Sequence, residues 1–213
     1  MRDRPVVALL GAVVLVATAG CAGTSNGAPI AATSTVGTST EPGQSTTAGS
    51  PDRHGAPRVD NPLDATPYLT QPCAAISPRL RQSLTIPGDG EADTSSAIGS
   101  RAPSCVWSEP INVGNGETVS VAFLKANKNG LVDLYRGNDS RPEAYWEETT
   151  VQGYPGVFHA GVDSRSAGQC TFAVGLDDAL AMSIYETGKL GVGSCERVKQ
   201  VAAAVIQTLK GQG

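Results

Sequence analysis

A long stretch of low-complexity sequence limits the part of this chain that can fold. From Ala22 to about Asp64 the residues are mostly Ser, Thr, Gly, Ala and Pro, with few aromatic or large aliphatic side chains. Such a composition buries too little apolar surface to offset the entropy of ordering the backbone. We therefore expect a disordered tether over residues 21–66 and one folded domain over residues 67–213, which is long enough to form its own core.

The first twenty residues have the three parts of an export signal. A short charged start precedes an apolar stretch at 6–17, and small residues at 18–20 lead directly to Cys21. This apolar length is typical of a signal peptide, whereas a membrane-spanning helix needs roughly 20 strongly apolar residues. Residues 1–20 are therefore predicted to be a lipoprotein signal peptide, with a cleaved secreted form or an uncleaved anchor as the alternatives.

The junction resembles a bacterial lipobox, because Ala19 and Gly20 precede Cys21, although Thr18 stands where Leu is most common. The resemblance implies that Cys21 becomes the new N-terminus and carries diacylglycerol on its sulfur, with a further acyl chain such as palmitate on its amine. Two or more acyl chains anchor a protein stably, whereas one is marginal. We expect an extracytoplasmic protein that is attached to the cell membrane by this lipid.

The charge of the exported part argues against nucleic acid as a partner. The chain has 16 basic and 20 acidic residues, and loss of residues 1–20 removes two Arg and one Asp. The remaining 14 basic and 19 acidic residues give a mildly acidic domain without a cluster of Lys or Arg. Proteins that bind nucleic acid neutralise phosphates with such clusters, so this class is excluded.

Four cysteines follow the tether, and an even number in an exported chain indicates disulfides. Three pairings are open to them. We favour Cys73 with Cys105 and Cys170 with Cys195, because these are sequence neighbours and each pair would join the approach to a predicted helix to a predicted strand. Zinc is the competing interpretation, but the chain has only two His and no Cys-x-x-Cys spacing.

Periodicity and turn residues predict an α-β-β-α-β-β-β-β-α order. Helices are expected at 78–84, 130–136 and 195–210, and strands at 105–107, 118–124, 146–152, 156–160, 170–176 and 179–186. Short turns between strands favour antiparallel pairing, and three helices are too few to cover both faces of a parallel sheet. The predicted class is α+β, with a five- or six-stranded antiparallel sheet and about three helices packed mainly on one face.

The ordered set of these segments resembles an actinobacterial lipoprotein family, the domain-of-unknown-function family 3558, to which some mycobacterial Lpr-type lipoproteins belong. The resemblance covers about residues 67–211. Its matching pieces are Pro72-Cys73, Cys105-Val106-Trp107, the Gly-Tyr-Pro-Gly-Val segment at 153–157, Cys170 and Cys195-Glu196. The resemblance supports the compartment and the fold. The family has no established activity to carry over, so it implies no mechanism.

The domain shows no recognisable catalytic constellation. His159 is its only histidine, and a lone imidazole on a strand is more often part of the packing than a catalyst. The acidic loop at 89–93 alternates oxygen ligands as a calcium loop does, but the Gly and the final Glu of that motif are missing. We expect no metal ligands and no cofactor.

Three aromatic residues are candidates for a recognition surface. Tyr154 is expected in a Gly-Tyr-Pro-Gly turn, and Tyr145 and Trp146 lie at the start of the preceding strand. Exposed aromatic side chains often mark binding surfaces.

We therefore expect a non-enzymatic binding domain, with an envelope protein or a small apolar ligand as its partner. The alternatives are an envelope hydrolase or transferase that uses His159 or the carboxylates of 89–93, and a structural envelope component.

Overall fold

The computed structural model describes residues 52–109 and 116–212 of the 213-residue chain. These residues belong to one compact unit. The expected signal peptide, Cys21 and the tether as far as residue 51 lie outside the described residues. Within the described ranges, none of the helices has the length and apolar character needed to cross a membrane.

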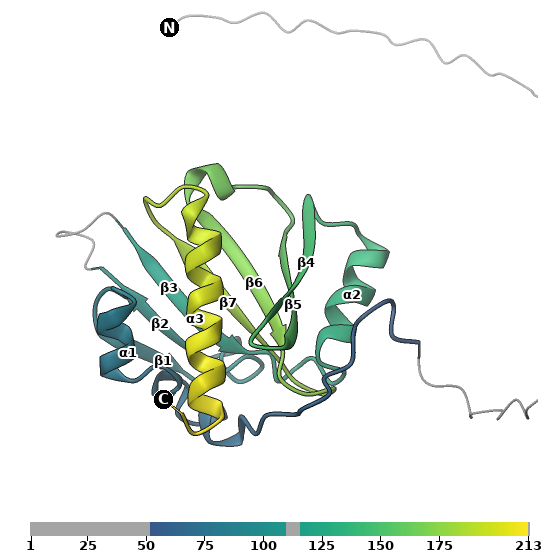
Figure 1. The fold of residues 1–213 in the computed structure, drawn as a ribbon, viewed down its shortest axis with the longest axis horizontal. Helices are drawn as coiled ribbons and strands as arrows, with labels where there is room; N and C mark the ends of the chain where they lie inside the picture. The colour runs from purple at the N-terminus through teal and green to yellow at the C-terminus, as the bar shows by residue number, and fades with distance from the viewer. Residues whose placement is uncertain (1–51, 110–115, 213) are drawn as a thin grey trace, which may run out of the picture. The chain divides into compact units, whose positions relative to one another are not determined.

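A seven-stranded antiparallel sheet with the order β1-β2-β3-β7-β6-β5-β4 forms the centre of the domain (Figure 1). Its strands are β1 (Gly90–Asp93), β2 (Ser104–Ser108), β3 (Thr118–Phe123), β4 (Tyr145–Val151), β5 (Tyr154–Ala160), β6 (Gln169–Gly175) and β7 (Ala181–Thr187). Every pair of neighbours is antiparallel, which confirms the antiparallel sheet expected from the sequence. The α+β class is confirmed, but the number of strands is larger than the expected five or six.

The additional strand is β1. Its Gly-Glu-Ala-Asp sequence has no apolar alternation, and its first three residues are exposed. Backbone pairing with β2 holds it, with Gly90 opposite Trp107 and Asp93 opposite Ser104. A strand whose side chains bury almost nothing leaves no hydrophobic pattern in the sequence, which is why this segment was expected to be a loop.

In the part of the chain that the structure describes, three α-helices and three 3-10 helices accompany the sheet. They are η1 (Thr66–Leu69), η2 (Pro72–Ala75), α1 (Pro78–Ser83), α2 (Leu131–Ser140), η3 (Arg165–Ala167) and α3 (Gly193–Leu209). The Ser77 hydroxyl accepts from the backbone N–H of Leu80, so α1 begins with the expected cap.

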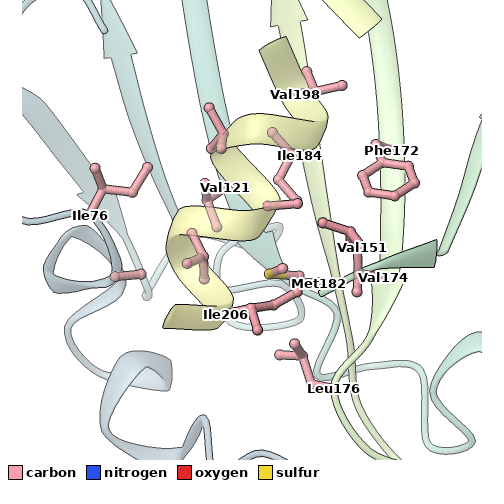
Figure 2. Close-up of a cluster of buried hydrophobic side chains, with 14 of the residues drawn as sticks. Ile76, Val121, Val151, Phe172, Val174, Leu176, Met182, Ile184, Val198 and Ile206 are labelled. Atoms are coloured by element: carbon pink, nitrogen blue, oxygen red, sulfur yellow. The ribbon is translucent and has the colours of Figure 1, made fainter. Parts of the chain in front are cut away.

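The main core lies between α3 and the sheet (Figure 2). Alternate residues of β3, namely Val119, Val121 and Phe123, are fully buried on this face, as their period of two predicted. The buried stripe of α3 includes Val198 and Val205 at helical spacing.

A second, smaller core lies on the opposite face, beneath α2. Val157 and Ala173 alternate with side chains that point toward α3, so they face the other way and contact Leu131 and Tyr135 of α2. Of the described α-helices, α1 and α3 pack on the main-core face, as expected for helices mainly on one side, and α2 covers the opposite face.

Two disulfides attach helical segments to the sheet. Cys73 of η2 is bonded to Cys105 of β2, and Cys170 of β6 is bonded to Cys195 in the first turn of α3. These are the two pairs favoured from the sequence. Their Cα atoms are 4.9 Å and 5.2 Å apart, within the usual range for disulfides.

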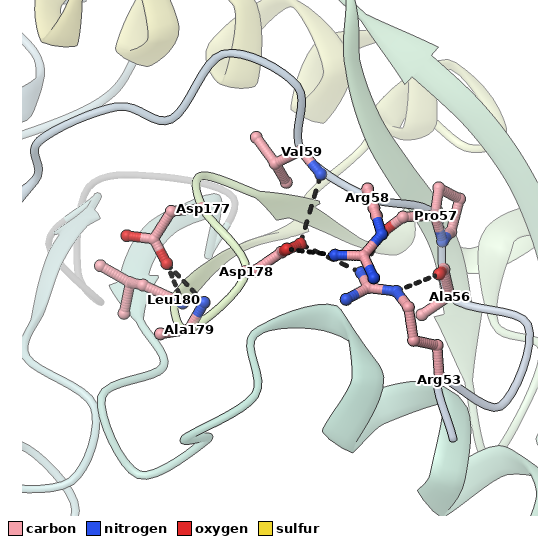
Figure 3. A network of polar contacts seen from close by, with 9 residues as sticks. All are labelled: Arg53, Ala56, Pro57, Arg58, Val59, Asp177, Asp178, Ala179 and Leu180. Carbon is pink, nitrogen blue, oxygen red and sulfur yellow. Dashed lines mark hydrogen bonds and ion pairs between the residues drawn. The ribbon is translucent and has the colours of Figure 1, made fainter. Parts of the chain in front are cut away.

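Residues 52–59 form a strap that is held against the turn between β6 and β7 (Figure 3). Asp178 accepts from Arg53 at 3.1 Å, from Arg58 at 3.4 Å and from the backbone N–H of Val59 at 3.4 Å. Apolar contacts reinforce this network, because Ala56 is buried in the smaller core.

The chain then crosses to the other face, where Leu63 and Ala65 are buried in the main core. The folded domain therefore begins before the expected boundary at residue 67. The apolar positions between 56 and 65 are too widely spaced to form a helical or strand pattern, so composition alone assigned them to the tether.

Candidate functional site

Two of the three aromatic side chains expected on a recognition surface are buried on the α3 side of the sheet. Tyr145 is 8% exposed, with the Arg165 guanidinium 4.0 Å from its ring centroid. Tyr154 is 5% exposed and belongs to the main core. Neither residue presents a free aromatic face.

Tyr154 was expected in an exposed turn, but the actual turn lies before it in the chain. Val151 pairs with Tyr154, so the connection consists of Gln152 and Gly153 alone. Both have positive φ, 53° and 84°, as a two-residue hairpin turn of the I′ kind requires. The composition of the Gly-Tyr-Pro-Gly segment suggested a turn two residues later.

Trp146 differs from these tyrosines because it points to the opposite face of the sheet and is only partly buried. Tyr135 of α2 meets its ring edge to face, with centroids 4.9 Å apart and an interplanar angle of 89°. Such a geometry is favourable for aromatic pairs and fixes the orientation of the indole.

His159 is the cross-strand partner of Trp146, and their ring centroids are 5.8 Å apart. Together they line a pocket of about 170 Å³ between the C-terminal half of α2 and the β4–β5 hairpin. The lining residues are Leu134, Gly137, Asn138, Arg141, Glu143, Trp146 and His159.

The last turn of α2 and the segment after it supply the polar wall of this pocket. The backbone of Arg141 caps the helix by donating to the Gly137 carbonyl. The side-chain oxygen of Asn138 accepts from the backbone N–H of Glu143 at 2.8 Å. These contacts hold the turn in place and leave the Arg141 side chain exposed at the rim of the pocket.

His159 and Glu143 form an acid–base pair, with Nδ1 and Oε1 3.8 Å apart. Burial lowers the pKa of His159 below 6.5, and the carboxylate of Glu143 partly opposes this effect. The Nε2 atom of His159 is buried without a hydrogen-bond partner. The imidazole is therefore held neutral beside an acid at neutral pH.

The carboxylates of 89–93 are not part of this site. Five strand spacings separate β1 from β5, which places them roughly 24 Å apart. Asp89 is fully exposed and pairs with Arg81. The carboxylate of Asp93 accepts from Ser95 and Ser96, and these hydrogen bonds lower its pKa. Within residues 52–109 and 116–212, no group of three or more His, Cys, Asp or Glu could hold a metal ion.

Sequence reasoning missed Asn138, Arg141 and Glu143. Asn138 lies in the last turn of α2, and Arg141 and Glu143 follow the helix, whereas the expected helix stopped earlier, at residue 136. The sequence did contain a signal for the later helix end, because the residue before a proline, here Arg141 before Pro142, often terminates a helix. Polar residues at this end directly precede the strand that carries Trp146.

The pocket combines a flat aromatic wall with hydrogen-bonding groups of both kinds. Its seven lining residues include a base and an acid but no hydroxyl or thiol. The arrangement can bind a small molecule of mixed polarity.

Comparison with known proteins identifies the family. The family model described as protein of unknown function (DUF3558) matches residues 16–208, which is most of the chain. The chain therefore belongs to this family, as the ordered segments indicated. No curated protein and no solved structure matches it.

Proposed function

We propose that this protein is a lipid-anchored protein of the cell envelope whose folded domain binds a small ligand without transforming it. Acylation of Cys21 provides the attachment to the membrane in this proposal. The ligand occupies the pocket between α2 and the β4–β5 hairpin.

The observation that supports this function is the fixed Trp146 ring at the wall of a polar pocket. Tyr135 and His159 hold the indole from two sides, so its orientation is set before any ligand arrives. Preorganised groups lose less conformational freedom on binding than mobile ones. Arg141, Asn138 and Glu143 then offer donors and acceptors around the ring.

The size and polarity of the pocket narrow the class of ligand. A volume of about 170 Å³ is smaller than the roughly 300–1,000 Å³ of a typical drug-sized site. We therefore propose a single ring, or the end of a longer molecule, with an apolar face for Trp146 and polar groups at its edge. This proposal differs from the expectation of an apolar ligand, because the pocket wall carries charged and polar groups.

The second candidate is an envelope hydrolase in which His159 activates a water molecule. The contact between His159 and Glu143 favours it, since a carboxylate that orients an imidazole is a recurring feature of general-base catalysis. In this candidate water attacks the substrate directly, and His159 serves as its general base.

The test is to purify the lipidated protein from its membrane and identify the small molecules that stay bound by mass spectrometry. We expect the amount of ligand that co-purifies with Arg141→Ala to fall at least tenfold, because the substitution removes a hydrogen-bond donor from the rim of the pocket. Arg79→Ala, which truncates a matched exposed arginine on α1, should retain it. Equal retention by both variants contradicts the proposal. Turnover of an envelope substrate that His159→Gln abolishes would favour the hydrolase.

A further inference from the structure

A cluster of charged side chains lies beneath the first turns of α3, away from the proposed ligand site. Glu186 is the last inward-facing residue of β7, after Met182 and Ile184, and its relative exposure is 0%. Its neighbours across the sheet are Val119 on β3 and Cys170 on β6. A carboxyl group in such surroundings is unusual, because Glu is almost never fully buried unless it is paired.

The pairing of Glu186 is incomplete. Arg197 on α3 lies 3.7 Å from Glu186 Oε1, but it lies closer, at 2.5 Å, to Oε1 of Glu117. Arg197 also donates to the backbone carbonyl of Thr85 at 2.8 Å. One guanidinium is therefore shared between two carboxylates and a carbonyl.

Both carboxyl oxygens of Glu186 are buried without a hydrogen-bond partner. An ionised carboxylate needs donors to replace the water that it loses, whereas a protonated one carries a smaller desolvation penalty. The side chains of Glu117 and Arg197 are 22% and 11% exposed, so Glu186 is the most deeply buried member. If both acids were ionised, the cluster would carry a net charge of −1.

We propose that Glu186, together with Glu117 and Arg197, forms a proton-binding site that controls how firmly the start of α3 is held against the sheet. With the proton in place, the two acids and one guanidinium are balanced. When Glu186 loses the proton, a buried negative charge faces Glu117, and the packing of α3 on β3 and β7 weakens.

The surroundings support a single titrating group. The charged side chains that face Glu186 are Glu117 from the residue before β3 and Arg197 from α3. On β6 the neighbouring Cys170 is held in a disulfide with Cys195 and does not titrate. Burial, with a smaller effect from Glu117, raises the pKa of Glu186 to about 7, although Arg197 opposes the shift.

The disulfide gives the site a mechanical connection to α3. Cys170 is the direct cross-strand neighbour of Glu186, and Cys195 is two residues before Arg197 on the helix. Ionisation of Glu186 on β7 therefore affects the first turn of α3, which the disulfide attaches to the neighbouring strand β6. Local opening is confined to this junction, because the rest of α3 is packed over the core.

The experiment is hydrogen exchange of the full lipidated protein in detergent, read on peptides from 183–200 and corrected for the intrinsic pH dependence of exchange. Because the pKa of the acid is near 4.5 in the open form and about 7 in the closed form, opening releases a proton between these values. We expect the opening equilibrium to rise up to tenfold per pH unit from about pH 5 to pH 7 and then to level off.

Glu186→Gln should abolish this dependence, because the amide cannot ionise. Glu117→Gln should shift the levelling point to lower pH, since removal of the second acid makes ionisation of Glu186 easier. Glu91→Gln, on the exposed strand β1, should behave like the wild type. Opening that is independent of pH in the wild type overturns the proposal, as does a slope that survives in Glu186→Gln. A slope that vanishes with added sodium at constant ionic strength would assign the site to a small cation.

Discussion

Gly90 and Trp107 are cross-strand partners in β1 and β2, and the indole occupies the space that a side chain at Gly90 would need. An added Cβ would lie 2.5 Å from the Trp107 nitrogen and 2.7 Å from the sulfur of Cys105. Neither neighbour can move aside, because Trp107 is 2% exposed and Cys105 is fully buried in a disulfide.

We therefore expect Gly90→Ala to lower the free energy of unfolding by about 1–3 kcal/mol, as overpacking does in other cores. Urea unfolding followed by circular dichroism measures this. Gly137→Ala is the matched control, because its Cβ would meet nothing within 4 Å and the residue lies inside α2. That variant should gain about 0.5–1 kcal/mol from helix propensity. A neutral Gly90→Ala would contradict the close contact.

The two disulfides close loops of 32 and 25 residues. The chain-entropy model predicts that removal of either one costs about 3–4 kcal/mol. The double variants Cys73→Ala/Cys105→Ala and Cys170→Ala/Cys195→Ala can be compared with wild type by urea unfolding. Non-reducing peptide mapping checks the pairing itself. A crosslink between Cys73 and Cys170 would contradict the structure.

The titration of His159 tests the geometry of the proposed ligand site. Burial should place its midpoint below 6.5 in an NMR titration of the imidazole signals, and Glu143→Gln should lower it further, because the carboxylate favours the protonated ring. His54→Gln removes the only other histidine and identifies the signal. A midpoint that is unchanged or higher in Glu143→Gln would contradict the interaction between the two side chains.

The same titration has a consequence for stability. A histidine with a lowered pKa is protonated more readily in the unfolded chain, so its contribution to stability falls as pH drops below about 6.5. Glu186 acts with the opposite sign, because its raised pKa makes stability fall as pH increases from about 4.5 to 7. The change due to Glu186 is on the order of 3 kcal/mol. We expect unfolding curves of Glu186→Gln and wild type to diverge most above pH 7.

The strap at 52–59 can be tested through Asp178. Asp178→Asn should cost only about 0.5–1 kcal/mol, because partly exposed ion pairs contribute little. Its effect on local opening should be larger, with tryptic cleavage after Arg53 and Arg58 several-fold faster than in wild type. Asp60→Asn, at an exposed position directly after the strap, is the control. Equal cleavage of both variants would show that Asp178 does not hold the strap.

Much of the fold could be predicted from the sequence, because its main strands bury one face and therefore alternate apolar and polar residues. The alternation in β3 correctly predicted that Val119, Val121 and Phe123 are buried. The apolar stripe of α3 likewise predicted the face of the helix that packs on the sheet. The disulfide pairing followed from the proximity of the cysteines along the chain. Strand β1 could not be predicted, because its own side chains bury little apolar surface and its residues have little β propensity.

The candidate site was less predictable than the fold, because it depends on which face each side chain occupies. Trp146 and His159 share a face only through the exact register of a two-residue turn at Gln152 and Gly153. A turn placed two residues later exposes Tyr154 instead. The burial of Glu186 could have been predicted in part. Met182 and Ile184 lie on the buried face of β7, and the next residue on that face is Glu186.

The strap and its acceptor also set the order in which the domain can be completed. Val59 and Asp178 are 119 residues apart in the chain, so the ribosome releases the first of them long before the second exists. Until the β6–β7 hairpin forms, the strap has no acceptor and the sheet lacks two of its inner strands. Contacts of such long range are associated with slow folding, and a newly made chain should therefore depend on protection from aggregation for longer than its size alone would suggest.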